Sequence, residues 1–181
     1  MSVAVCVMPL RTYLSGALQR IWDGGPRPPS LRRRTAEEVR GDVDAFRDQL
    51  EKLVAFRPEW DEEGPARDAK VFSLDNFAGP FQYARSQAYR RRLPVLCGLE
   101  APQLWLPVEF EPVFEVAPPW NPESRLGLAS AVRVAAELER LGEWMAEEDR
   151  EDLAGPRHVA EQLRGLAVLG LQHRTPVVVE G

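Results

Sequence analysis

The sequence predicts an α+β fold in which a small, mainly antiparallel sheet packs against several helices. Its 181 residues match the size of one domain, so we expect a single globular domain over residues 1–181. Short apolar runs alternate irregularly with amphipathic helical stretches, an order typical of α+β proteins. In the middle of the chain, apolar runs at 93–99 and 103–110 are separated by Glu100-Ala101-Pro102. That spacing predicts a central hairpin over 93–110.

Composition limits the classes of partner and cellular location. The formal net charge of −5 argues against nucleic acid as a partner, because phosphate binding needs a basic face. No apolar run reaches the length of a membrane-spanning helix, and the start of the chain lacks the basic region of a signal peptide. We therefore expect no membrane partner and a cytoplasmic location.

The N-terminal elements are predicted as a strand, a helix and a loop. Residues 2–7 are largely apolar and rich in valine, as in a buried strand. Leucines and an isoleucine recur on one face over 10–22 and predict a short helix. Glycines and prolines in 23–34 prevent regular structure and predict a flexible loop.

The next helix has the clearest sequence signature. Thr35 followed by Glu38 forms a capping box at its start. Apolar residues then repeat at spacings of four and three, which predicts one buried stripe. The stripe consists of Val39, Val43, Phe46, Leu50 and Leu53. Such a stripe can serve a core or a dimer, so the oligomeric state stays open. A second flexible loop is expected over 57–69.

Strands and one helix are predicted between residues 71 and 116. Residues 71–74 favour a short strand, and Asp75 is a candidate N-cap for a helix that reaches about Arg92. The hairpin follows, with a further apolar run at 112–116. Pro107 and Pro112 each remove a backbone donor, so we expect an edge or a bulge among these strands.

The C-terminal third is predicted to be mainly helical. After a loop over 117–127, Ser130 is a candidate cap for a helix. Its apolar face contains Val134, Leu138, Leu141 and Met145. A second helix follows Gly155-Pro156, with an apolar face of Val159, Leu163, Leu166 and Leu169. Residues 175–181 predict a last strand.

The sequence carries no familiar catalytic, cofactor or metal motif. Cys6 and Cys97 lie in apolar runs, where we expect buried and inert thiols on strands. Glu109 and Glu111 would point the same way on a strand, either as a solvated pair or as carboxylates for acid/base chemistry. With His173, which we otherwise expect to complement the dipole at a helix end, they define an alternative hydrolase-type site. We predict no catalytic residue, no cofactor and no metal site as the first interpretation.

Acidic residues beside tryptophans are the strongest candidates for a functional surface. An aromatic anchor with a charged rim is typical of protein interfaces. The predicted partner-binding residues are Trp60, Asp61, Glu62, Glu63, Trp120, Trp144, Glu147, Glu148 and Asp149. The alternative is that each tryptophan belongs to the core and the acidic residues are solvated.

Two segments carry a family resemblance. An apolar strand pair in LPVLCGLEAPQLWLPVEFEPVFEV (93–116) is followed by RLGLASAVRVAAELERL (125–141). Together they resemble small immunity proteins of bacterial polymorphic toxin systems. The resemblance implies an α+β, non-enzymatic, cytosolic protein that occludes a toxin. The expected function is thus a protein-binding module, with a cognate toxin, for example a basic nuclease domain, as partner. The alternatives are the hydrolase and a stand-alone scaffold or regulatory protein.

Overall fold

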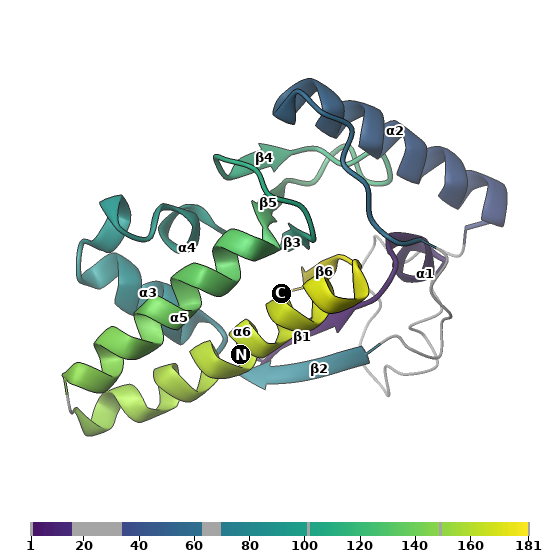
Figure 1. The fold of residues 1–181 in the computed structure, drawn as a ribbon. Coiled ribbons are helices and arrows are strands. Elements are labelled where there is room, and N and C mark those ends of the chain that lie inside the picture. Colours follow the sequence, from purple (N-terminus) through teal and green to yellow (C-terminus); the bar gives the residue numbers. More distant parts are fainter. Residues whose placement is uncertain (1, 16–33, 63–69, 101, 149, 181) are drawn as a thin grey trace.

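A computed structural model describes residues 2–15, 34–62, 70–100, 102–148 and 150–180. In these residues a six-stranded sheet has helices on both faces (Figure 1). The strands are β1 (Ser2–Val7), β2 (Lys70–Asp75), β3 (Gln103–Leu106), β4 (Phe114–Val116), β5 (Leu126–Ser130) and β6 (Val177–Glu180). The helices are α1 (Leu10–Leu14), α2 (Ala36–Val54), α3 (Ala78–Ser86), η4 (Tyr89–Arg91), α4 (Pro94–Gly98), α5 (Ala131–Glu147), η5 (Glu151–Leu153) and α6 (Ala154–His173). The α+β class is confirmed.

The sheet is mixed, with strand order β2-β1-β6-β3-β5-β4. β3 and β5 are parallel, and the other neighbouring pairs are antiparallel, so the predicted mainly antiparallel sheet is confirmed. Because side chains alternate along a strand, the sheet separates two cores. On β6, for example, Val177 and Val179 enter one core, and Val178 enters the other.

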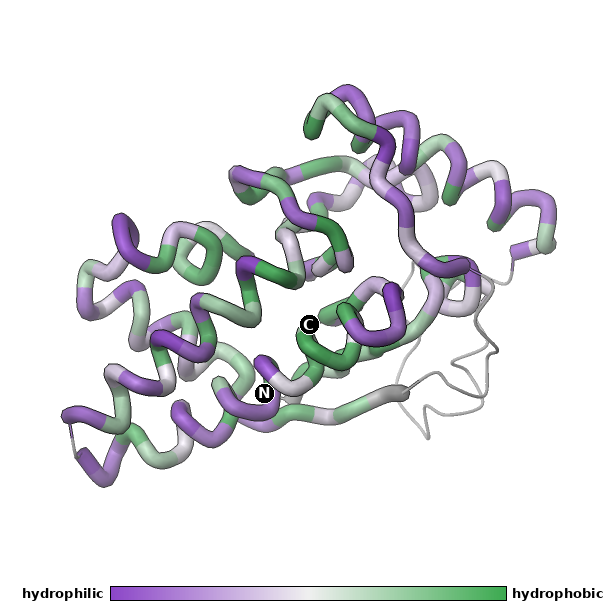
Figure 2. Tube along the Cα trace, viewed as in Figure 1, coloured by the Kyte–Doolittle hydropathy of each residue, from purple (hydrophilic) through white to green (hydrophobic). Residues whose placement is uncertain are grey.

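The helices divide between the two faces. α3, α4, α5 and α6 cover the face that contains the fully buried Trp105. α1 and α2 cover the opposite face, where Phe46 of α2 is fully buried. Hydrophobic and hydrophilic positions alternate along α2, as expected for a helix that packs on one side (Figure 2). α5 and α6 pack side by side as a long helical hairpin (Figure 1).

The predicted central hairpin over 93–110 is wrong. Residues 94–98 form helix α4, with Pro94 in its first turn, and Cys97 therefore lies on a helix and not on a strand. β3 is limited to 103–106 and pairs with β5 and β6. Pro94 is well suited to a helix start because its missing N–H needs no partner there. A buried apolar run of this length has no periodicity that separates strand from helix.

The predicted loop over 117–127 ends in a strand that the sequence prediction missed. β5 begins at Leu126 and runs into Ser130. Gly127 allows the preceding chain to approach closely, since a Cβ there would lie 2.9 Å from the carbonyl oxygen of Glu100. The Gly127 N–H donates to the carbonyl of Pro102 at 3.0 Å. Glycine weakens a strand pattern in the sequence, but here it permits the pairing.

Other boundaries differ from the prediction at helix ends. The helix expected from Asp75 to Arg92 is α3 over 78–86, and Ala88 with left-handed backbone (φ 57°) separates it from η4. α1 covers Leu10–Leu14, and most of the remaining helix predicted to residue 22 lies outside the described residues. The same is true of 23–33 and 63–69, which make up most of the two predicted loops.

The predicted helix starts are confirmed at α2 and α5. The Thr35 side chain accepts the N–H of Glu38, and the Glu38 carboxylate accepts the N–H of Thr35 at 2.7 Å. Ser130 caps α5 by accepting the N–H of Arg133. Four residues of the predicted α2 stripe are buried, whereas the fifth, Leu53, is exposed.

Candidate interaction surface

Two of the three predicted tryptophan anchors are core residues. Trp60 and Trp120 are 5% and 8% exposed. Both rings pack edge-on against Phe46, with centroid distances of 6.4 Å and 4.9 Å. The guanidinium of Arg47 lies 4.7 Å from the Trp60 ring. Because a buried ring cannot act as an exposed anchor, the structure favours the core alternative for both tryptophans.

The carboxylate of Glu62 is hydrogen-bonded within the fold and is not solvated. Its buried side chain accepts the backbone N–H of Arg11 at 2.7 Å and the indole N–H of Trp60. It thereby satisfies a donor in the first turn of α1. Burial raises the pKa of Glu62, and the two hydrogen bonds and Arg47 oppose the shift. Asp61 is exposed, with its N–H donating to the carbonyl of Arg174 at 2.7 Å. Glu63 lies outside the described residues.

The third predicted anchor, Trp144, is half-buried near the tip of the α5–α6 hairpin. Its ring packs on Tyr89 at 4.6 Å, and the Arg92 guanidinium lies 5.8 Å from its centroid. Nearby, the hydroxyl of Tyr83 donates to Glu148. Burial and this carboxylate raise the pKa of Tyr83.

The acidic residues beside Trp144 differ in how far the structure describes them. Glu147 and Glu148 are exposed, and Asp149 lies outside the described residues. Glu148 also forms an ion pair with Arg150 at 3.3 Å. The tip therefore retains an exposed acidic surface beside a partly accessible ring.

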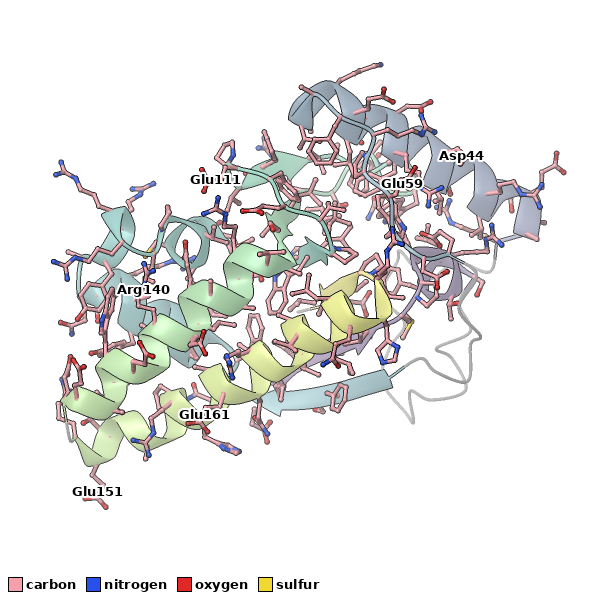
Figure 3. All side chains as sticks on the ribbon, in the orientation of Figure 1. Asp44, Glu59, Glu111, Arg140, Glu151 and Glu161 are labelled. Carbon is pink, nitrogen blue, oxygen red and sulfur yellow. The ribbon has the colours of Figure 1, made fainter. Side chains whose placement is uncertain are left out.

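The two predicted acidic clusters lie at opposite ends of the molecule. Glu59, next to Trp60 in the chain, lies beside α2, whereas Glu151 lies at the far tip of the α5–α6 hairpin (Figure 3). The structure thus brings together Trp60 and Trp120 through Phe46, but it does not join them to Trp144. The predicted residues therefore fall into two separate groups.

The C-terminal end of α2 exposes an apolar pair that the sequence prediction missed. Leu53 and Phe56 are 40% and 41% exposed, and they are the large hydrophobic residues exposed among those described. α2 ends at Val54, and Ala55 follows with left-handed backbone (φ 61°). The Ala55 N–H donates to the Glu51 carbonyl at 3.1 Å. The sequence predicted Leu53 as the last residue of the buried stripe. The stripe continues along α2 beyond Leu50, its last buried residue, so Leu53 belongs to the stripe but is exposed.

Charged side chains of both signs lie near this apolar pair. α2 carries six acidic and three basic side chains. Arg57 pairs with Asp48 at 2.8 Å and with Glu51 at 3.2 Å, while Asp44 and Glu59 extend from the same side of the molecule (Figure 3). A cavity of about 360 Å³ adjoins the segment after α2. Its lining is Arg47, Arg57, Pro58, Glu59, Trp60, Asp61 and Arg174. Exposed apolar side chains within a charged rim are the chemistry of a protein interface.

The residues of the alternative hydrolase-type site lie at the surface, where the two glutamates form ion pairs. Glu109 and Glu111 lie in irregular chain, not on the predicted strand. They are exposed, and both bind Nη2 of Arg133, at 3.2 Å and 2.8 Å. His173 is exposed at the end of α6.

The two thiols differ in their surroundings. Cys6 is fully buried on β1, and burial followed by the charge of Glu180 raises its pKa to about 12. Cys97 is half-buried on α4, where burial again raises its pKa. Raised pKa values disfavour the reactive thiolate at both positions.

Within the described ranges, no three His, Cys, Asp or Glu residues form a group that can hold a metal ion. No helix in those ranges combines the length and apolarity that crossing a bilayer requires. No family model, curated protein or solved structure matches this chain.

Proposed function

We propose that this chain is a non-enzymatic protein-binding module, and most concretely an immunity protein that binds and neutralises a cognate bacterial toxin in the cytoplasm. The observation that carries the proposal is the exposed pair Leu53 and Phe56 at the C-terminal end of the net acidic helix α2. The proposed occupant of this surface is a basic face of the toxin, for example of a nuclease domain.

The physical argument combines apolar contact with charge. Burying Leu53 and Phe56 in an interface removes from water the roughly 40% of each residue that is still exposed, worth about 0.6–1.2 kcal/mol each. The carboxylates of α2, which outnumber its basic side chains six to three, attract a basic surface and accelerate its association. Leu53 is on the last turn of the 19-residue helix α2 and continues the stripe in which Phe46 anchors the helix in the core. The anchor is thus presented on a rigid element.

The test is binding and protection with the product of the adjacent gene. We expect co-expression to protect cells from that product and the two proteins to form a 1:1 complex. The double substitution Leu53→Ala and Phe56→Ala should weaken the complex about tenfold or more, as expected for anchors at an interface. The loss should appear mainly as faster dissociation. Failure of the native chain to bind, or unchanged affinity of the double variant, would refute the proposal.

Trp144→Ala is the matched control at the other acidic surface. It removes an aromatic side chain larger than that of Phe56 from the hairpin tip and leaves α2 intact. We expect it to retain binding within a few-fold. If Trp144→Ala abolishes binding and the α2 variant does not, the interface lies at the tip. Binding without protection from toxicity would instead favour a scaffold or regulatory protein.

A further inference from the structure

A second candidate site lies on the sheet face covered by α1 and α2, apart from the proposed interface. It is a cavity of about 150 Å³ between the sheet, α1 and the 118–124 segment. Its apolar walls include Leu10, Leu104, Leu126 and Val178. A cavity of about this volume holds a ligand the size of benzene, roughly six non-hydrogen atoms.

One carboxylate stands among these apolar walls. Glu180, on β6, lines the cavity and accepts a hydrogen bond from the hydroxyl of Tyr13. Among the described residues, no lysine, arginine or histidine forms an ion pair with it. A carboxylate in an apolar site without a counter-charge is costly, so a ligand that supplies a positive charge would be favoured there.

Two aromatic side chains line the same cavity. Tyr13 and Trp120 are both almost fully buried, and both belong to its wall. Aromatic rings attract cations through their π systems, and tryptophan does so most strongly. A carboxylate with two aromatic rings is therefore suited to an organic ammonium group. A divalent metal ion would need several oxygen ligands, which a single carboxylate between leucine and valine side chains does not provide.

We propose that this cavity binds a primary alkylammonium ion, with its charge on Glu180 beside Tyr13 and its alkyl chain between Leu104, Leu126 and Val178. Glu180 is half-buried, so part of this residue remains accessible to solvent. This location lets a ligand enter with its charged end solvated until it meets the carboxylate. The source of the ammonium is either a free amine or a lysine side chain of another protein.

The experiment compares an amine and an alcohol of matched size, and a lysine derivative, on the intact chain by ligand-observed NMR. The probes are n-pentylamine, Nα-acetyl-lysine methylamide as the peptide source, and 1-pentanol as the neutral control. We expect at least one amine to bind, and to bind at least about tenfold more tightly than 1-pentanol. If neither amine binds, or if the alcohol binds as well as both amines, the proposal is overturned.

Substitutions then test whether Glu180 carries the charge that binds the amine. Glu180→Gln should weaken amine binding about tenfold or more, whereas Glu123→Gln, which removes an exposed carboxylate from the neighbouring segment, should leave it unchanged. Tyr13→Phe should retain binding, because the carboxylate is kept. Equal binding to the native chain and Glu180→Gln would overturn the proposal. If Glu180→Gln does not fold, a pH series on the native chain decides. Affinity must rise with pH as Glu180 ionises, and a flat profile contradicts the assignment.

Discussion

The carboxylate of Glu137, on α5, accepts the backbone N–H of Leu96 at 2.9 Å and thereby caps α4 from another helix. It also accepts the N–H of Val95 at 3.1 Å. Glu62 makes the equivalent contact with Arg11 at the start of α1. Both capped helices have five residues, too few for independent stability in water. A buried carboxylate from elsewhere in the fold therefore fixes each short helix.

Removing the Glu137 carboxylate should destabilise the fold. Glu137→Ala leaves two backbone donors of α4 without this partner in a buried location, and we expect the free energy of unfolding to fall by about 2–3 kcal/mol. Urea denaturation at neutral pH measures this loss. The matched control is Glu139→Ala on the same helix, where an exposed pair with Arg164 predicts a change below about 0.5 kcal/mol. Equal losses in the two variants would contradict the capping role.

The Glu137 carboxylate should also make the stability of the fold depend on pH, in a direction that follows from its pKa. Burial raises the pKa of Glu137 above its ordinary value of 4.5, although two N–H donors and the nearby Arg140 and Arg133 oppose the shift. A pKa raised in the folded state contributes stability that is complete below pH 4.5 and is lost as pH rises through the folded pKa. The native chain should therefore lose stability relative to Glu137→Gln over this interval.

Urea denaturation between about pH 4 and 8 checks this sign in both proteins. The free energy of unfolding of the native chain minus that of Glu137→Gln should decrease as pH rises and then become constant. A difference that increases with pH would mean that the folded pKa is lowered, and it would refute the assignment.

Local signals predicted much of the secondary structure correctly. The capping box at Thr35 and Glu38 and the Ser130 cap locate the starts of α2 and α5, because caps act within one turn of chain. β1 and β6 were also predicted, since each is a short run rich in β-branched residues. These elements depend on neighbours in the sequence.

The errors arose where distant residues decide the structure. Helix α4 is capped by Glu137, about 40 positions away, so its apolar run alone could not separate helix from strand. The parallel pairing of β3 with β5 joins strands that have β4 between them in the sequence. At the candidate site, Trp60 has acidic neighbours in sequence but packs on Phe46, and only the folded chain reveals that contact.

Two glycines of α6 should respond oppositely to the same substitution. A Cβ at Gly170 would lie 2.7 Å from a methyl carbon of Val177 and 3.0 Å from the carbonyl oxygen of Thr175. Gly170→Ala therefore forces α6 and β6 apart, and we expect a loss of about 1–3 kcal/mol. At Gly165 nothing lies within 4 Å, so Gly165→Ala should stabilise the helix by up to about 1 kcal/mol. Thermal denaturation of both variants checks the signs, and stabilisation by Gly170→Ala would contradict this packing of α6 on β6.

The end of α2 should be stabilised by a glycine. Ala55 has a φ of 61°, a left-handed conformation that costs a residue with a Cβ about 1 kcal/mol relative to glycine. Ala55→Gly should therefore raise the free energy of unfolding by about 0.5–1 kcal/mol, even though glycine also increases the entropy of the unfolded chain. Ala45→Gly, at an exposed position inside the same helix, should lower it by about 1 kcal/mol. Because Ala55 sets the direction in which the chain leaves α2, this pair also tests the backbone that presents Phe56. Destabilisation by Ala55→Gly as large as that by Ala45→Gly, measured by urea denaturation, would show that the left-handed turn does not form there.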